Sequence, residues 1–262
     1  MKKQFLWALV LVLGLAGFAA AQGTAKVYVV HGIPGLDIGA DPALPVDVVI
    51  NGACAITNFQ FGQVVGPVEL PADTYSVAIQ LYDATGNCGG AVAIGPVDLP
   101  FEAGKIYTVI AHLTDAGAPT ASLFTNDLGP TGPGNTRLIV HHTAWAPEVD
   151  VTVARDPYAP PQAKAPKLFV GDFANGDQVQ ADVRPGTWYV SLAPAGSGMT
   201  LIGPVPVELE PFTGYLVFAV GSLENGTFTF IIKPIDGLKD NPKPKKMGPA
   251  QPQGPSPKKI KK

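Results

Sequence analysis

The chain has 262 residues, of which 46% are hydrophobic and 15% charged, so it holds enough apolar material for a core and few charges to solvate. Its 30 glycines and 27 prolines fall short of the share typical of low-complexity chains. In a folded protein they favour many turns between short strands. Beyond residue 21 the apolar residues do not follow the i, i+3, i+4 spacing of a helix. We therefore expect an all-β protein of one large or two ordinary domains.

The first residues have the pattern of a targeting segment. Two lysines precede an apolar run over residues 5–18, and Ala19-Ala20-Ala21 supplies the small residues of a cleavage site. The alternative is an uncleaved anchor, but the run is short for a bilayer span of roughly 20 residues. We expect a signal peptide over residues 1–21 and an exported mature protein, periplasmic or extracellular, without a transmembrane span.

Short strands alternate with turns through the first half of the mature chain. Asn51-Gly52 is a strong hairpin signal, because both positions of such a turn require positive φ. We expect strands within residues 25–31, 46–50, 59–61, 74–82, 94–99, 106–113 and 121–124. Seven or so short strands in about a hundred residues predict a β-sandwich.

A stretch rich in glycine and proline, residues 128–135, interrupts this pattern, and the same order of elements then repeats. The turn and strand at residues 70–77 have a partner at residues 183–190. The other recurring landmarks are residues 26–31 with 137–141, 46–48 with 149–151, 94–97 with 202–205, and 104–113 with 214–223. We predict one domain over residues 22–127, a linker over 128–135 and a second domain over 136–236.

Cys54 and Cys88 are the two cysteines of the chain. In an exported protein a disulfide between them is the default expectation, and two buried thiols are the alternative. No Cys-x-x-Cys spacing supports a redox or zinc role. Since the second copy has no cysteine, the bridge would stabilise the first copy alone.

The repeated motifs resemble a bacterial family, the domain of unknown function numbered 4397. The first copy carries Val30-His31, Pro45-Val46-Asp47-Val48, Asn51-Gly52, Phe61-Gly62, residues 70–75 and residues 104–109, and the second carries Val140-His141, residues 147–151, residues 173–176, residues 185–188 and residues 219–221. Asp73 departs from the glycine usual there, although Asp tolerates positive φ. The resemblance implies exported, tandem immunoglobulin-like β-sandwiches, and it implies no activity.

Two histidines and two aspartates recur in both copies. We place His31 and His141 at equivalent strand ends, with Asp47 and Asp150 in the next strands, and His142 adds a third imidazole. One interpretation is a binding or metal site, because imidazole is a common metal ligand. The interpretation we favour is a buried structural hydrogen bond in each sandwich, with no metal.

The sequence offers no arrangement typical of catalysis. It lacks Gly-x-Ser-x-Gly, His-Glu-x-x-His and a phosphate-binding loop. Ser197 falls in a glycine-rich hairpin loop, and Glu208 and Glu210 share a solvated strand face rather than forming a glycosidase pair. The oxygen-rich turn at residues 83–87 is typical of an Asx turn rather than a calcium site. We predict that the protein is not an enzyme and uses no cofactor.

Aromatic residues provide an alternative function. Tyr158 lies in a proline-rich insertion of the second copy and, with Trp145, could form an exposed surface for a glycan or a peptide. For Trp188, which alternates within a strand, we expect a core position. The sequence leaves the place of Trp145 open.

The C-terminal residues 237–262 are rich in Lys and Pro, and we expect them to be disordered. Residues 239–262 hold eight lysines and Asp240, a net charge of +7, whereas residues 4–238 hold 8 basic and 20 acidic residues, a net charge of −12. The tail either docks on anionic polymer or lipid head groups or acts as a solubilising segment. No specific nucleic-acid partner is expected.

Together these patterns predict an exported, non-catalytic protein of two β-sandwich domains that serves as a cell-envelope or extracellular interaction module. The alternative is a carbohydrate- or metal-binding protein that uses exposed aromatic residues or the His and Asp positions.

Overall fold

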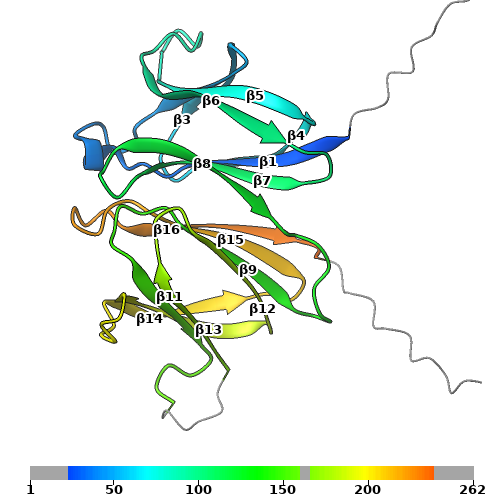
Figure 1. The fold of residues 1–262 in the computed structure, drawn as a ribbon, viewed down its shortest axis with the longest axis vertical. Helices are drawn as coiled ribbons and strands as arrows, with labels where there is room; N and C mark the ends of the chain where they lie inside the picture. Colours follow the sequence, from blue (N-terminus) through cyan, green and yellow to red (C-terminus); the bar gives the residue numbers. More distant parts are fainter. Residues whose placement is uncertain (1–22, 160–165, 239–262) are drawn as a thin grey trace, which may run out of the picture.

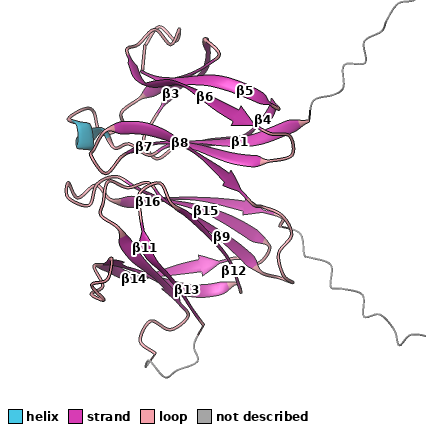
Figure 2. Cartoon of the chain, in the orientation of Figure 1, coloured by secondary structure: helices cyan, strands magenta, loops and turns pink. Residues whose placement is uncertain are grey.

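The computed structural model describes residues 23–159 and 166–238, so the predicted signal peptide and nearly all of the Lys-rich tail lie outside the described residues. The described residues form sixteen β-strands and one 3-10 helix, η1 (Gly35–Ile38). Figure 2 shows how completely strands dominate. The predicted all-β fold is confirmed.

The first eight strands build one sandwich from two four-stranded sheets, in the orders β4-β1-β7-β8 and β3-β2-β5-β6. Alternating apolar side chains of the two sheets face each other and form its core. The strands are β1 (Thr24–His31), β2 (Val46–Ile50), β3 (Ala53–Phe59), β4 (Val64–Pro71), β5 (Asp73–Leu81), β6 (Val92–Phe101), β7 (Ile106–Leu113) and β8 (Pro119–Asn126).

The next eight strands repeat this architecture, in the orders β12-β9-β15-β16 and β11-β10-β13-β14. Strands that correspond in the sequence repeat therefore occupy corresponding positions in the two sandwiches. The strands are β9 (Thr136–His142), β10 (Val149–Ala154), β11 (Lys167–Phe173), β12 (Gln178–Val183), β13 (Gly186–Pro194), β14 (Ile202–Leu209), β15 (Thr213–Val220) and β16 (Thr229–Asp236).

Each sandwich contains one parallel pair among its antiparallel ones. Strand β1 runs parallel to β7, and β9 runs parallel to β15. A parallel pair between the first and the seventh strand of each copy ties the two ends of the copy together. The sandwich architecture is that of the prediction, but its eight strands exceed the seven of the constant-type immunoglobulin domain.

The two sandwiches stack face to face, so the four sheets form four successive layers (Figure 1). A core cluster lies between the two inner sheets and draws Tyr28, Val30 and Ile110 from the first sandwich and Ile139, Leu216 and Phe218 from the second. The inner sheets are therefore covered on both faces. This explains why β7 and β15 are nearly continuous runs of buried residues rather than alternating ones.

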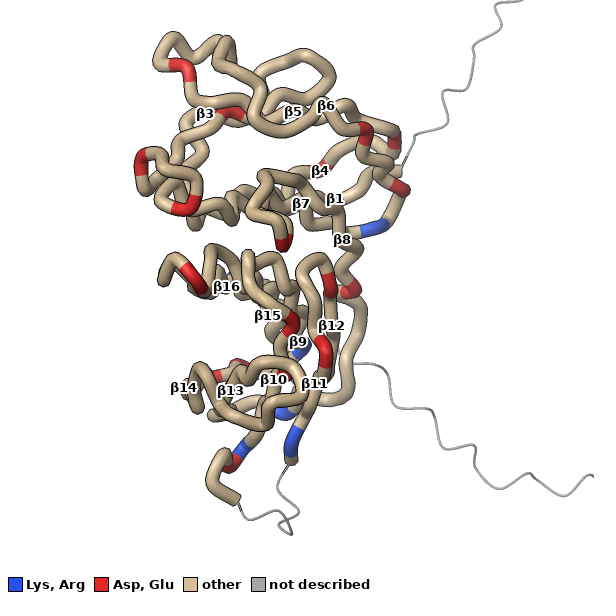
Figure 3. The backbone as a smooth tube through the Cα atoms, turned by 60° about the vertical axis from the view of Figure 1, so that its left-hand side comes forward, with Lys and Arg blue, Asp and Glu red and all other residues tan. Residues whose placement is uncertain are grey.

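Figure 3 marks the positions of the charged residues along the backbone of the two sandwiches. Acidic residues are spread over both sandwiches, and basic ones are few. Among the Asp, Glu, Lys and Arg residues that the structure describes, Asp47 and Arg137 are buried. Arg137, at the start of β9, is 6% exposed and donates to both oxygens of Asp182, at 2.6 and 2.9 Å. Its Nη1 also donates to the carbonyl of Asp127 at the end of the first sandwich.

Candidate functional site

The strand register changes which histidines of the two copies correspond. His31 lies opposite Ala111 on β7, and His142 lies opposite Ala219 on β15. The two alanines occupy the same place in the repeated Tyr-x-x-x-Ala segment of these strands. His31 therefore corresponds to His142, and the predicted equivalence with His141 is wrong by one residue. Because side chains alternate between faces, this shift moves His141 to the opposite face of its sheet.

His31 is a buried, fully hydrogen-bonded imidazole. The backbone N–H of Ile33 donates to its Nδ1 at 3.3 Å, which leaves Nε2–H to donate to the carbonyl of Leu44 at 2.8 Å. Burial lowers the pKa of His31, so the ring is neutral at ordinary pH. This histidine holds the chain after β1 against the loop before β2, and neither ring nitrogen is left for a ligand.

Asp47 and Asp150 each join two strands and a loop. Asp47 accepts from the backbone N–H of Asn58 and of Asp83, both at 3.0 Å. Asp150 accepts from Asp172 at 3.2 Å and from Gly196 at 3.0 Å. In both copies the carboxylate thus binds the backbone where the register of two strands shifts, between β2 and β3 in the first and between β10 and β11 in the second. Their partners are backbone amides and not the histidines, so the proposed His–Asp pairs do not form.

His141 lies between the two sandwiches. Its ring stacks on Phe218 at 4.6 Å and meets Phe124 edge-on at 4.7 Å. Nδ1 lies 3.2 Å from the carbonyl of Val217, and Nε2 has no hydrogen-bond partner. Burial lowers the pKa of His141 to about 4. Within residues 23–159 and 166–238, no three His, Cys, Asp or Glu side chains come together as a metal site.

The predicted disulfide between Cys54 and Cys88 is present. It joins β3 to the loop before β6 on the outer face of the first sandwich. Cys88 packs there with Val49 and Ala78 in a small buried cluster. This bridge closes the outer face at the centre of its sheet.

The aromatic residues take three different places. Trp188 is 4% exposed, in the core as predicted, and donates from Nε1 to the carbonyl of Arg184. Trp145 of the second sandwich lies against Gly117 of the first. A Cβ atom at residue 117 would lie only 2.9 Å from the indole ring. Tyr158 is 81% exposed. Trp145 therefore joins the domains and is not part of an exposed platform with Tyr158.

The outer face of the second sandwich carries a groove of about 530 Å³. Thr152 on β10 lies at its centre, opposite Phe169 on β11 and Ser191 on β13. In the next row Ala154 lies between Lys167 and Tyr189. We call this surface the outer groove; it is lined by Asp150, Thr152, Ala154, Asp156, Pro157, Ala159, Pro166, Lys167, Phe169, Tyr189, Ser191, Leu192, Ala193, Gly198 and Thr200.

Side-chain size gives the outer groove its shape. Small residues occupy the middle of the sheet, and the larger Phe169 and Tyr189 flank them on opposite sides. Phe169 is 60% exposed, an uncommon place for so large an apolar ring. The groove combines aromatic rings with hydroxyl groups, which suits a ligand that has both apolar faces and hydroxyls.

Sequence reasoning missed Phe169 and Tyr189. The signal that could have found Tyr189 is alternation in β13, where Trp188, Val190 and Leu192 face inward and Tyr189 must therefore face outward. Of the residues named from the sequence, Asp150 alone reaches this groove.

Within the described part of the chain, no helix is long or apolar enough to span a bilayer. No curated protein matches the sequence. Two solved structures are similar: a candidate cell adhesion protein from Bacteroides ovatus ATCC 8483 (11% identity, 84% of this chain, 100% of that chain, TM-score 0.25) and the Bacillus anthracis TIE protein (10% identity, 76% of this chain, 33% of that chain, TM-score 0.22). Both are too remote to assign a function.

The family model described as "Domain of unknown function (DUF4397)" matches residues 25–152. Through these residues, which span the first sandwich and the start of the second, the chain belongs to the DUF4397 family.

Proposed function

We propose that the protein is an exported, non-catalytic interaction module that binds carbohydrate in the outer groove. The observation that carries the proposal is the placing of Phe169 and Tyr189 on either side of a hollow that also presents Thr152 and Ser191. Sugar rings have apolar C–H faces that pack on aromatic rings and hydroxyls that hydrogen-bond to polar groups, so both halves of the groove match one chemistry.

The export part of the proposal is supported by two features. The N-terminal residues have the charge, apolar run and small residues of a signal peptide. The Cys54–Cys88 disulfide is typical of proteins that fold in an oxidising compartment. Together they favour a periplasmic or extracellular location.

The non-catalytic part is supported by what the polar side chains already bind. Both nitrogens of His31 and both oxygens of Asp47 and of Asp150 hold hydrogen bonds to the backbone. These hydrogen bonds give the histidine and both carboxylates roles in holding loops and strands together, which supports a non-catalytic module.

The test is affinity electrophoresis of the purified mature protein through gels that contain one soluble polysaccharide each, across neutral and acidic polymers. We expect at least one polymer to retard the protein, and Phe169→Ala and Tyr189→Ala each to weaken retardation about tenfold, since each removes a buried apolar contact of about 1.5 kcal/mol. Tyr82→Ala in the first sandwich, where the ring is 38% exposed, is the matched control. Equal mobility of all four proteins in every gel would contradict the proposal.

A second contact is proposed for the Lys-rich tail. Its +7 charge opposes the −12 of residues 4–238 and suits anionic polymer or lipid head groups of the envelope. Deleting residues 239–262 should abolish retention on anionic envelope material at low salt, and salt near the physiological level should release the intact protein. If the shortened protein is retained equally at low salt, the tail has no such role.

A further inference from the structure

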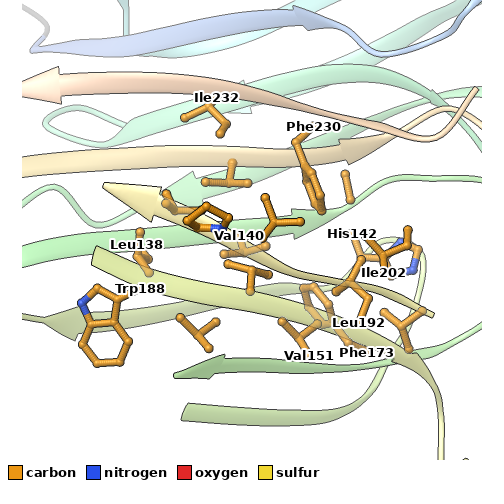
Figure 4. A pocket seen from close by; sticks show the side chains of 18 of the residues that line it. Leu138, Val140, His142, Val151, Phe173, Trp188, Leu192, Ile202, Phe230 and Ile232 are labelled. Carbon is orange, nitrogen blue, oxygen red and sulfur yellow. The ribbon is translucent and has the colours of Figure 1, made fainter. Parts of the chain in front are cut away.

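The interior of the second sandwich contains a cavity of about 390 Å³ between its two sheets. Figure 4 shows side chains from both sheets around it, with Trp188 toward one end and His142 and Phe173 toward the other. The volume falls in the range of ligand pockets. It is more than twice the roughly 150 Å³ of an engineered apolar cavity that stays dry and binds benzene.

The lining is almost wholly hydrocarbon. Valines, leucines, isoleucines and phenylalanines from both sheets supply most of it. Of the two ionisable lining residues, Glu208 accepts a hydrogen bond from the hydroxyl of Thr187 at 2.7 Å, and His142 lies edge-on against Phe173. A water molecule finds few hydrogen-bond partners in such a space, whereas an apolar molecule needs none.

The cavity reaches solvent at one edge. Val205 on β14 and Ile232 on β16 both line it, yet they are 44% and 48% exposed. In the first sandwich the corresponding strands β6 and β8 contact each other across that edge. Strands β14 and β16 make no comparable contact, so the second sandwich is open where the first is closed.

We propose that this cavity binds one linear acyl chain, which enters between β14 and β16 and leaves its polar head group in water at the mouth. The space lies between two sheets and follows β14 from Ile202 to Leu209, a shape that suits a linear hydrocarbon. The apolar lining holds the chain by burial alone, and the head group needs no partner inside. The proposal is independent of carbohydrate binding in the outer groove.

The test uses the intact mature protein and cis-parinaric acid, a fatty acid that becomes fluorescent in apolar surroundings. Saturable binding at a 1:1 ratio is expected, with displacement by palmitate if the chain comes from free fatty acid and by lysophosphatidylcholine if it comes from a phospholipid. Either displacement supports the proposal. The absence of saturable binding overturns it.

Single-residue variants test whether the fatty-acid probe binds in this cavity. Val207→Phe places a large ring in the cavity and should weaken binding at least tenfold, whereas Val97→Phe on the matching edge strand of the first sandwich should leave it unchanged. Should Val207→Phe fail to fold, Val205→Trp at the exposed mouth is the second blocking variant. Undiminished binding in the folded blocking variant overturns the proposal. Phe169→Ala, which affects only the outer groove, should bind the fatty acid normally, so the two proposals can fail separately.

Discussion

The same place on the outer sheet is sealed in the first sandwich and open in the second. In the first, Val49 lies opposite Cys54 and Ala78, and the disulfide to Cys88 covers them. In the second, the matching position is Thr152, opposite Phe169 and Ser191, and no bridge covers it. The first copy has a covalent bridge at the place where the second presents the outer groove.

The sheet edges formed by β6 and β8 in the first copy and by β14 and β16 in the second show the same contrast between closed and open. Strands β6 and β8 meet and close the first sandwich, and Leu99 and Phe101 fill its interior. The matching residues on β14 are the smaller Val207 and Leu209. At both places the first copy is closed, by the disulfide and by the contact of β6 with β8, and the second copy is open.

Removing the disulfide should have the largest effect on this comparison. Cys54 and Cys88 are 34 residues apart, for which the chain-entropy account gives a loss of about 3–4 kcal/mol when both become serine. Urea unfolding of the double variant measures the loss, and reductant should reproduce it in the wild type. Binding in the outer groove should persist while the protein is folded. An unchanged unfolding midpoint would show that the bridge is not what closes the first sandwich.

On the inner faces, Val30 in the first sandwich is matched by the ionisable His141 in the second. Because burial lowers the pKa of His141 from 6.5 to about 4, the unfolded chain binds more protons between these pH values. The contribution of His141 to the free energy of unfolding is therefore constant above about pH 6.5 and falls by about 3 kcal/mol toward pH 4. His141→Val should remove that share of the acid sensitivity.

Denaturant unfolding at pH 7.5 and at pH 4.5 gives the difference to compare between wild type and variant. His31, His112 and His142 also have pKa values lowered by burial, so the variant keeps part of the slope. A variant with the full slope of the wild type would mean that His141 is protonated in the folded protein.

The repeat, the strands and the disulfide could be predicted because each leaves a local pattern. Alternation marks strands, glycine and proline mark turns, and two cysteines in an exported chain favour one bridge. The histidine equivalence failed because His141 and His142 are adjacent, and motif matching cannot decide which of two neighbours fills one strand position. The turn at Asp73 also differs from expectation. Its φ is not positive, and its carboxylate accepts from the backbone N–H of Thr74 instead.

The stacking of the sandwiches and both openings could not be predicted. The nearly continuous apolar runs of β7 and β15 indicate that both faces of these strands are covered, but an apolar face has the same pattern whether it packs on its own core or on another domain. The cavity depends on how far β14 and β16 separate, which is a property of the packed sheets and not of either strand. The outer groove requires the register of three strands at once.

A smaller contrast concerns the first charged residue of each matching strand, Lys26 on β1 and Arg137 on β9. Lys26 lies 3.8 Å from Glu69, and both side chains are about half exposed. Arg137 is buried and forms two hydrogen bonds with Asp182. Arg137→Ala should cost about 2–3 kcal/mol, since it removes charge-assisted hydrogen bonds together with the packing of a buried side chain, and Lys26→Ala less than about 0.5 kcal/mol. Equal costs in thermal or urea unfolding would contradict this contrast.

The smallest effect is expected from exchanging residues at the matched interior position, Leu99 in the first sandwich and Val207 in the second. Val207→Leu adds one methylene to the cavity wall, where space is free, and should stabilise the protein by about 0.8 kcal/mol. Leu99→Val removes a methylene from a packed core and should cost about 1 kcal/mol.

Opposite signs for the two swaps, measured by thermal unfolding under one set of conditions, are the result that separates a filled core from an open one. If both swaps destabilise, the space beside Val207 cannot accept even one methylene and the contrast between the two interiors is lost. If both are neutral, neither position is packed tightly enough to distinguish the copies. With opposite signs, the Val207→Leu protein should also bind the fatty-acid probe more weakly than the wild type, because the added methylene occupies volume that the acyl chain would otherwise fill.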